Sequence, residues 1–365
     1  MMKKFFRTLL LIINLFFVVL FVFSTMAEFV SPRKFILFSF LSYGYGILLI
    51  ANILFVMVWL ILKRWEFLIS TLAIVLRISV FPYFFQFGGG SSRSDASLLD
   101  GSDLVVMSFN AHLFSGKEDS ESDTKGNIAQ FLDVVGQQDP DVMCLQEFCN
   151  IYGVGDSIEL QGYKYMYSDK SPRGYVHPYG TVLYSKYPIV KIGDVQGSTK
   201  FFVDIKVHDD TVRAFCVHLD SYELTESDYE ELENLSQGTF KKTMYKLGGK
   251  MKTTILQHEE EWDILHQAIQ ESPYPVIIAG DFNDTPMSYI CGRMRRLLND
   301  SFEGYGKGFG VTYHGRYPNY RIDYVYHSSS IKVLSYSRIK SDMSDHYPIV
   351  VHLDFENTNK EDPLS

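Results

Sequence analysis

The chain has 365 residues, 46% of them hydrophobic, and a formal net charge of −9 at pH 7. Its longest apolar runs lie near the start: residues 8–27 and 35–62 contain no charged residue, and residues 67–87 contain only Arg77. A run of about 18 or more apolar residues is long enough to cross a bilayer. Three such runs exclude a wholly soluble protein and a simple secretory signal, which has one short apolar core. Residues 1–87 are therefore predicted to form a membrane anchor of three transmembrane helices.

The remainder of the chain is acidic. Residues 1–96 contain nine Lys and Arg against three Asp and Glu, which leaves 25 basic and 40 acidic residues in 97–365, a formal charge of −15. Such a surface repels polyanions, so tight sequence-independent binding to duplex nucleic acid is not favoured. The four cysteines form no CxxC pair and lie mostly in apolar runs, so we expect buried thiols and leave their pairing open.

Residues 88–102 are rich in Gly and Ser in their first part and are predicted to form a flexible linker. Short runs rich in Val, Ile and aromatic residues follow and are predicted to be buried strands. They occupy residues 104–109, 141–145, 181–184, 201–207, 212–217, 276–279, 322–326 and 347–353. Helical patterns occupy residues 126–135, 253–270 and 287–298. We therefore expect one mixed α/β domain over residues 103–354, with two sheets packed face to face, and a polar tail over 355–365.

Polar side chains lie at the ends of most of these predicted strands. They are Asn110, Glu147, His218, Asp281, Asn283, Asp323, Asp345 and His346. Each alone has an ordinary structural explanation, because Asn and Asp suit turns and caps and a lone histidine is often half-buried. If the strands are neighbours, however, their ends converge. The side chains would then gather at one rim of the sheets, where ligand sites on α/β folds commonly form.

Taken in order, these motifs resemble those of the endonuclease/exonuclease/phosphatase superfamily. The resemblance covers about residues 103–354 and rests on Ser-Phe-Asn110, Leu-Gln-Glu147, His218-Leu, Gly-Asp281-Phe-Asn283, Arg-Ile-Asp323-Tyr and Ser-Asp345-His346-Tyr-Pro. It implies a four-layer α/β/β/α sandwich. It also implies hydrolysis of a phosphoester that depends on Mg²⁺, with Mn²⁺ as a substitute.

The resemblance implies a metal site and a site for the attacking water. Glu147, with Asn110 and Asp345, would hold the metal ion through oxygen atoms, which are the ligands that Mg²⁺ prefers. Asp281 would position or deprotonate the water. Asn283 would donate hydrogen bonds to the non-bridging oxygens of the phosphoryl group.

Two histidines would contact the same phosphoryl group. Asp323 would set the tautomer of His346 and favour its charged form. His218 would be the second imidazole. In the deoxyribonuclease branch of the superfamily a glutamate supports this histidine, whereas residues 175–184 of this chain contain no acid. The partner of His218 is therefore left open.

Two further segments are candidates for substrate selection. Residues 221–252 place six acids before five lysines, which include Lys241 and Lys242. This segment either walls the site or forms a solvated helix–loop–helix whose charges pair with one another. The aromatic residues of the Gly-rich segment 304–321 either stack on a substrate or pack on the domain. Arg321 either binds phosphate or pairs with a neighbouring carboxylate.

The leading hypothesis is a membrane-tethered, Mg²⁺-dependent phosphoesterase that acts on a small or lipid-borne phosphodiester or phosphomonoester. One alternative is a metal-dependent nuclease, which the acidic domain and the fixed attachment disfavour. Another is a non-catalytic membrane protein that binds phosphorylated ligands, against which the presence of Asp281, Asn283 and His346 argues. The substrate and the oligomeric state stay open.

Charges near the apolar runs predict the orientation, because Lys and Arg are in excess on the cytoplasmic side. With three spans, five basic residues lie on the side of the N-terminus and three on the other. This favours an integral protein of a bacterial-type inner membrane with its catalytic domain on the periplasmic or outer side. Arg77 leaves a second arrangement open, in which the third run lies in the interface and the domain returns to the cytoplasm.

Overall fold

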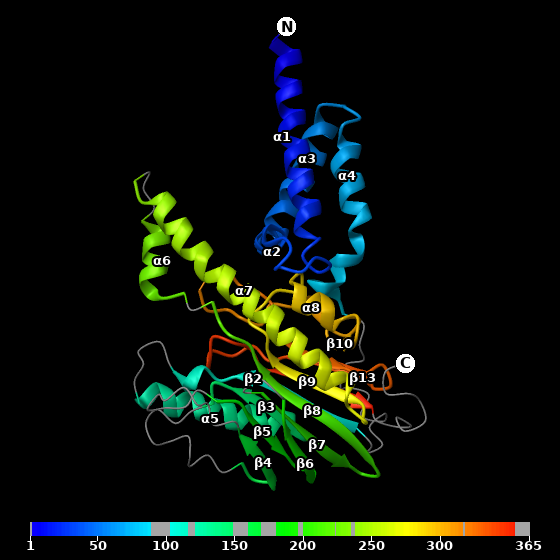
Figure 1. Ribbon diagram of the computed structural model, residues 1–365, viewed down its shortest axis with the longest axis vertical. Helices are drawn as coiled ribbons and strands as arrows, with labels where there is room; N and C mark the ends of the chain where they lie inside the picture. Colours follow the sequence, from blue (N-terminus) through cyan, green and yellow to red (C-terminus); the bar gives the residue numbers. More distant parts are fainter. Residues whose placement is uncertain are drawn as a thin grey trace. The chain divides into compact units, whose positions relative to one another are not determined.

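In a computed structural model, the chain divides into two compact units (Figure 1). The first unit consists of Met1–Pro82, Ser221–Glu260 and Asp284–Arg293, and the second of Tyr83–Asp220, Glu261–Asn283 and Met294–Ser365. The structure describes residues 2–88, 103–115, 121–148, 160–168, 180–195, 200–222, 224–234, 238–316 and 318–354. The predicted linker, apart from Gly88, and the predicted tail at 355–365 lie outside the described residues.

The apolar start of the chain forms four α-helices rather than three long spans. They are α1 (Met2–Ser24), α2 (Ile36–Tyr43), α3 (Tyr45–Ile61) and α4 (Phe67–Leu76). Among the described residues, only Lys4–Ser24 of α1 is a single helix long and apolar enough to cross a membrane. α2 and α3 make a second candidate only if one span contains their bend of 70°. The prediction of three transmembrane helices is therefore wrong.

Local features interrupt the second and third apolar runs. Gly44 lies between α2 and α3, and glycine is a poor helix former. Arg77 ends α4, and its guanidinium bonds the Glu28 carboxylate at 2.7 Å and the Thr25 carbonyl at 3.2 Å. The chain continues as a 3₁₀ helix that contains Pro82. A count of apolar residues detects neither break, because it measures hydropathy and not helix continuity.

The interior of this helix group contains a polar network, although its sequence is apolar. α1, α3 and α4 pack against one another, and the side chains of Asn14, Asn52 and Ser70 are fully buried. Asn14 donates to Ser70 at 2.6 Å, Ser70 to Asn52 at 2.8 Å, and Trp59 to Asn14 at 2.8 Å. Large apolar side chains are exposed instead, among them Phe5, Ile12, Phe16, Ile47 and Leu72. Hydrogen bonds inside and apolar side chains outside are typical of helices that associate in lipid.

The charged segment before residue 252 folds into a helical hairpin of the same unit. α6 (Glu226–Glu233) precedes α7 (Phe240–Gln270). Asp228 of α6 pairs with Lys246 of α7 at 2.8 Å and with Lys250 at 2.6 Å. The opposite charges of this segment thus pair with one another, which is the second of the two arrangements expected from the sequence.

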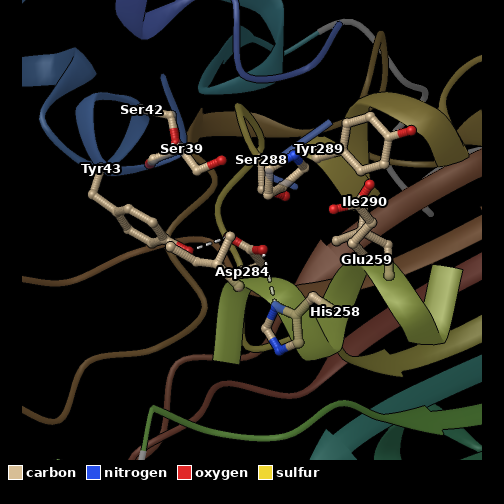
Figure 2. A pocket seen from close by; sticks show the side chains of 11 residues that line it. Ser39, Ser42, Tyr43, His258, Glu259, Asp284, Ser288, Tyr289 and Ile290 are labelled. Atoms are coloured by element: carbon tan, nitrogen blue, oxygen red, sulfur yellow. Dashed lines mark hydrogen bonds and ion pairs between the residues drawn. The ribbon is translucent and has the colours of Figure 1, made fainter. Parts of the chain in front are cut away.

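A buried aspartate connects three parts of the first unit (Figure 2). Asp284 accepts a hydrogen bond from the hydroxyl of Tyr43 in α2 at 2.5 Å and contacts Nδ1 of His258 in α7 at 3.0 Å. The hydroxyl of Tyr43 also bonds that of Tyr222. Asp284 and His258 are 3% and 2% exposed. The carboxylate therefore depends on these partners in place of water. α8 (Tyr289–Met294) follows Asp284 in the chain.

The second unit contains two six-stranded sheets of mixed direction. The first has the order β13-β14-β2-β3-β5-β4 and the second β10-β12-β9-β8-β7-β6. The first consists of β2 (Asp103–Asn110), β3 (Val142–Gln146), β4 (Tyr165–Ser168), β5 (Val182–Ser185), β13 (Lys332–Arg338) and β14 (Ile349–Asp354). The second consists of β6 (Ile189–Asp194), β7 (Phe201–Val207), β8 (Asp210–His218), β9 (Val276–Asp281), β10 (Asn299–Asp300) and β12 (Asp323–His327). A separate two-stranded sheet joins β1 (Phe85–Phe87) to β11 (Lys307–Phe309).

The two large sheets pack face to face around an apolar layer. Val106 of β2, Val203 of β7 and Val351 of β14 are fully buried in one cluster. Successive residues of a strand point to opposite faces. The next positions in β2, Met107 and Phe109, therefore pack on the other face, in a cluster with residues of α5 (Glu121–Gln138).

Helices cover both sheets, as the sequence predicts for an α/β fold of two packed sheets. The end of α7 contributes the buried residues Trp262 and Leu265 to the second unit. Glu261 of α7 pairs with Lys200, which precedes β7. All eight predicted strands are present. β4, β6 and β13 escaped prediction because they lie at sheet edges and are only partly buried, so their sequences lack a continuous apolar run.

Candidate active site

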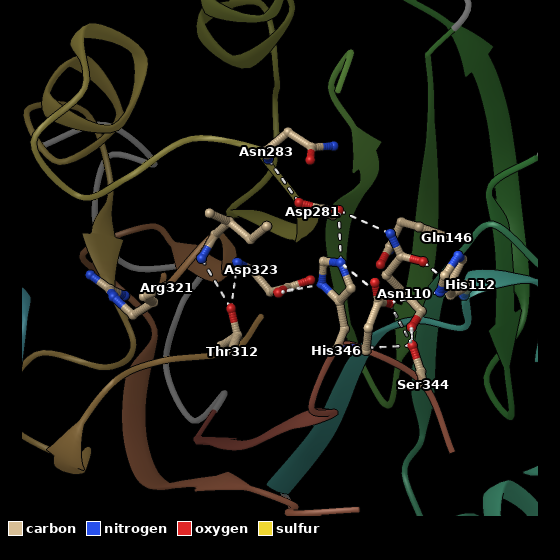
Figure 3. A network of polar contacts seen from close by, with 12 residues as sticks. Asn110, His112, Gln146, Asp281, Asn283, Thr312, Arg321, Asp323, Ser344 and His346 are labelled. Atoms are coloured by element: carbon tan, nitrogen blue, oxygen red, sulfur yellow. Dashed lines mark hydrogen bonds and ion pairs between the residues drawn. The ribbon is translucent and has the colours of Figure 1, made fainter. Parts of the chain in front are cut away.

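The predicted site residues of the second unit lie at the ends of strands in both sheets (Figure 3). β8 ends at His218 and β9 at Asp281, and the parallel register places these residues side by side. β12 begins at Asp323, opposite Asp281 in the antiparallel register. In the other sheet β2 ends at Asn110, whose amide donates to Asp281 at 2.9 Å. The strand ends therefore converge, and the hydrogen bond from Asn110 to Asp281 connects the two sheets there.

Sharp turns bring further groups to this rim. Glu147 and Asn283 follow β3 and β9 with φ angles of 47° and 48°, a left-handed conformation that changes the direction of the chain after each strand. Gly280 precedes Asp281 where β8 and β9 lie very close. A Cβ at this position would lie 1.8 Å from the carbonyl oxygen of Val217, so a side chain here would force the two strands apart.

Asp281 is at the centre of the cluster. Its Oδ2 lies 3.8 Å from Nε2 of His346 and 3.9 Å from Nε2 of His218, and its Oδ1 accepts the backbone N–H of Asn283 at 2.7 Å. Burial and then the charge of Asp323 raise the pKa of Asp281 to about 6, against the opposing effect of the two imidazoles. A carboxylate with such a pKa can accept a proton near neutral pH.

His346 is held as a cation by carboxylates. Its Nδ1 lies 2.9 Å from Oδ2 of Asp323, and both side chains are buried. Burial alone would lower the pKa of His346, but the charges of Asp323 and Asp281 raise it to about 10. Both ring nitrogens then carry hydrogen. Because Nδ1–H bonds Asp323, Nε2–H is the donor on the side of Asp281. Oγ1 of Thr312 accepts the backbone N–H of Asp323 at 3.0 Å.

His218 and Glu147 form the second contact of the cluster. Nε2 of His218 lies 3.5 Å from Oε1 of Glu147. This nitrogen is buried and has no hydrogen-bond partner among the described residues. A buried donor without a partner is costly unless water or a ligand satisfies it. Glu147 and Asp281 are thus the acidic neighbours of His218 that the sequence did not identify. Half of the stretch 175–184, residues 175–179, lies outside the described residues.

Two residues of this site were missed from the sequence. Nδ1 of His112 lies 3.0 Å from Oδ1 of Asp345, and the backbone N–H of His112 donates to Oδ1 of Asn110 at 2.9 Å. The contact with Asp345 raises the pKa of His112. Burial of Asp345 favours a higher pKa for its carboxyl group, but the contact with His112 outweighs it and the pKa of Asp345 is lowered. The ring of Tyr313 packs edge-on against His346 at 5.2 Å between centroids. The sequence offered one signal for His112, which is its position two residues after the predicted site residue Asn110.

Three oxygen-bearing side chains at the rim fit a hard divalent cation. Asn110, Glu147 and Asp345 offer one amide and two carboxylates. The two carboxylate side chains are 23% and 27% exposed. Mg²⁺ binds to oxygen and keeps several of its waters, so partly exposed carboxylates suit it.

A second group of possible ligands lies deeper. Atoms of Asp281, Asp323 and His346 lie within 4.8 Å of one another, and all three residues are buried. With a pKa of about 10, His346 carries a proton on both nitrogens and has no lone pair to offer a metal ion. The oxygen donors at the rim therefore fit a cation better than this buried group does.

The remaining predicted residues lie elsewhere or are already bonded. The side-chain amide of Asn283 donates to the carbonyl of Leu219 at 2.9 Å. Arg321 forms a bidentate salt bridge with the buried Asp300, at 3.0 and 2.7 Å, and lies apart from the cluster in Figure 3. It thus follows the carboxylate-pairing alternative. Lys241 and Lys242 are exposed residues of α7 in the first unit. We do not assign a role in catalysis to these two lysines or to Arg321.

Comparison with known proteins identifies the family. Residues 107–346 match the model of the Endonuclease/Exonuclease/phosphatase family, so this chain belongs to that family. Its members are typically metal-dependent phosphoesterases or nucleases. Residues 6–84 match a domain of unknown function. No curated protein sequence matches the chain.

Solved structures are similar to about 70% of this chain at low sequence identity. The endonuclease/exonuclease/phosphatase from Bacteroides vulgatus is 14% identical, with a TM-score of 0.51 over 70% of this chain and 99% of that one. A family protein from Leptotrichia buccalis C-1013-b is also 14% identical, with a TM-score of 0.48 over 69% and 100%. The human Nocturnin catalytic domain, solved with a bound sulfate, is 16% identical, with a TM-score of 0.48 over 69% and 94%. The first of these similarities supports the fold alone.

Proposed function

We propose that this protein is a membrane-tethered, Mg²⁺-dependent phosphoesterase that hydrolyses a small or lipid-borne phosphodiester or phosphomonoester. One observation carries the proposal: Nε2 of His346 and Nε2 of His218 lie 3.8 and 3.9 Å from the same oxygen of Asp281. Two N–H donors beside a general base suit phosphoryl transfer. The oxygens of the phosphoryl group need stabilisation while water attacks the phosphorus.

Asp281 acts as the base. Its pKa of about 6 leaves it mostly ionised at pH 7 and still able to take a proton from an attacking water. The amide of Asn110 and the backbone N–H of Asn283 hold the two oxygens of the carboxylate. The water therefore meets an acceptor whose orientation is fixed before the substrate arrives.

The two histidines bind the phosphoryl oxygens. His346 is positively charged at pH 7, and a charge-assisted hydrogen bond from Nε2–H is stronger than a neutral one. His218 donates through Nε2, which is otherwise without a hydrogen-bond partner among the described residues. The side-chain amide of Asn283 donates one N–H to the Leu219 carbonyl and has its second N–H as a further donor.

Glu147, Asn110 and Asp345 would hold the Mg²⁺ ion. The bound ion would neutralise charge on the phosphate and help to orient it. Asn110 connects this set to the base, since its amide bonds Asp281 and also lies 3.3 Å from Glu147. His112 keeps Asp345 oriented and ionised through its contact at 3.0 Å.

The first unit is the membrane tether. Its buried polar network and its many exposed apolar side chains suit a lipid environment, and α1 is long enough to cross a bilayer. Three basic residues precede or begin α1, and Arg33 with Lys34 follow it. This excess favours an N-terminus in the cytoplasm and a chain after α1 on the outer side of the inner membrane. Reporter fusions after residue 97, one active only in the cytoplasm and one only after export, test the orientation; a purely cytoplasmic signal would contradict it.

The proposed activity is tested with the purified full chain in detergent. It is assayed with Mg²⁺ against phospholipids, inositol phosphates, nucleotide derivatives, plasmid DNA and RNA. We expect hydrolysis of a small or lipid substrate that is abolished by a chelator and restored by Mg²⁺. Efficient cleavage of plasmid or RNA with a steep negative salt dependence would identify a nuclease instead. Binding of phosphorylated ligands without hydrolysis would identify a non-catalytic relative.

A further inference from the structure

A groove in the first unit is lined by cationic and apolar side chains together. It lies between residues 32–37, which lead into α2, and one face of α7. Lys34 and Lys252 contribute charge, and Phe35, Leu37 and Leu256 contribute apolar surface. Phe35 and Leu37 are 45% and 46% exposed, so their apolar surface is only partly covered by the chain. No carboxylate is among the residues that line the groove in the part of the chain that the structure describes.

The cations around the groove differ in how they are paired. Arg33, which also lines it, lies 3.9 Å from Glu259 and 3.3 Å from Glu260. Lys246 and Lys250, six and two residues before Lys252 in α7, both pair with Asp228 of α6. Lys34 and Lys252 are exposed and form no ion pair with a described residue. Two lysines on separate elements therefore remain to bind an anion.

The apolar side chains that line the groove favour an anion that also has an apolar part. An inorganic phosphate or a nucleotide would use the lysines and leave Phe35, Leu37 and Leu256 in water. A phospholipid with an acidic head group uses both parts, since its phosphate meets the charges and its acyl chain covers apolar area. The position in the chain agrees, because seven residues separate the end of α1 at Ser24 from Pro32 at the groove. Residues just beyond a membrane-spanning helix lie at the level of the head groups.

We infer that this groove binds an acidic phospholipid of the membrane that α1 crosses. The phosphate lies between Lys34 and Lys252, and the first part of one acyl chain runs along Phe35, Leu37 and Leu256. The inference rests on the insertion of α1 proposed above and does not depend on the catalytic activity. A lysine near an anionic membrane surface strengthens binding about fivefold, so removing both should weaken it by about 25-fold.

The test uses the full chain reconstituted in nanodiscs that contain equal amounts of phosphatidylglycerol and phosphatidylcholine. Native mass spectrometry after release from the disc counts the lipids that stay bound. We expect preferential retention of phosphatidylglycerol, and a fall in its ratio to phosphatidylcholine of at least about tenfold in K34Q/K252Q. The matched control is K241Q/K242Q, which removes two exposed lysines of the same α7 outside the groove and should keep the ratio of the unmodified chain. Leu37→Ser should lower retention of both lipids.

Three results would overturn the inference. These are equal retention of the two lipids by the unmodified chain, an unchanged ratio in K34Q/K252Q, or displacement of phosphatidylglycerol by inorganic phosphate, which would assign the lysines to a soluble anion. Extraction of membranes with alkaline carbonate measures the insertion of α1 separately. Release of the chain by carbonate would refute the tether, whereas firm insertion without lipid preference would refute only the groove.

Discussion

Two buried aspartate–histidine pairs of nearly equal geometry occur in the two units of this protein. Nδ1 of His346 lies 2.9 Å from Asp323, and Nδ1 of His258 lies 3.0 Å from Asp284. The hydroxyl of Tyr43 and a backbone N–H satisfy Asp284 in addition to His258. The pair of Asp323 and His346 lies beside Nε2 of His218, which has no hydrogen-bond partner among the described residues, and beside the partly exposed carboxylates of Glu147 and Asp345. A buried pair thus indicates chemistry only where neighbouring polar groups remain for a ligand, and we assign catalysis to the first pair and stability to the second.

The largest expected effect is on turnover, at His346 of the first pair and at its neighbour Asp281. Asp281→Asn or His346→Ala should lower kcat by about 100-fold to 1,000-fold, because each removes a group that acts on the transition state. The substrate is the best one found in the panel, and circular dichroism checks that the fold is kept. Unchanged turnover in either variant would remove that residue from the mechanism.

The pair in the first unit should affect stability instead. His258→Ala leaves a buried carboxylate with one partner fewer and should lower the free energy of unfolding by about 1–3 kcal/mol. Thermal unfolding in detergent measures this as a lower midpoint, while kcat per folded molecule should change less than threefold. A loss of kcat as large as that of His346→Ala, at an unchanged midpoint, would reverse our assignment of the two pairs.

A smaller effect is expected at the metal site. His112→Ala removes the partner that orients Asp345 and lowers its pKa. Removal of such a partner typically weakens metal binding by about tenfold to 100-fold. Activity measured against Mg²⁺ concentration should therefore need about tenfold more Mg²⁺ for half-saturation, with a nearly unchanged maximum. Equal Mg²⁺ dependence in both proteins would show that Asp345 does not need His112.

The smallest effect concerns pH. Asp323 favours the charged form of His346, so Asp323→Asn should lower the pKa of His346 from about 10. The imidazolium is then lost at lower pH, and the alkaline limb of the kcat profile should move to lower pH by about one unit. Asp281 still supports the charge, which limits the shift. A limb that stays in place would mean that His346 does not control it.

The sequence predicted the central strands well, and it also predicted that polar side chains gather at their ends, because both depend on local patterns. A central strand buried on both faces is a continuous apolar run, and a polar residue at its end stands out. The convergence of Asn110 and Asp281 followed from the expectation that the strands are neighbours. Sequence motifs indicated which residue types gather there, and the structure adds how they pair. His218 contacts Glu147, and Arg321 pairs with Asp300. The sequence did not show these partners, because each pair depends on turns and on strands that are distant in the chain.

The membrane part was predicted less well for a physical reason. Hydropathy reports the composition of a segment, whereas Gly44 and the bonds of Arg77 determine where its helices stop. The polar contacts among Asn14, Asn52 and Ser70 were invisible for the same reason. Each of these residues is a single polar position in an apolar run, and only the packing of α1 against α3 and α4 brings them together.

The central claim is that the second unit directs water onto phosphorus. Its most direct test is the hydrolysis of bis-p-nitrophenyl phosphate by the full chain with Mg²⁺, in water enriched in oxygen-18. Mass spectrometry of the products locates the heavy oxygen. Our account predicts that it appears in the p-nitrophenyl phosphate and not in the nitrophenol, and that Asp281→Asn slows its appearance about 100-fold or more. Heavy oxygen in the nitrophenol, or an equal rate in Asp281→Asn, would contradict the account.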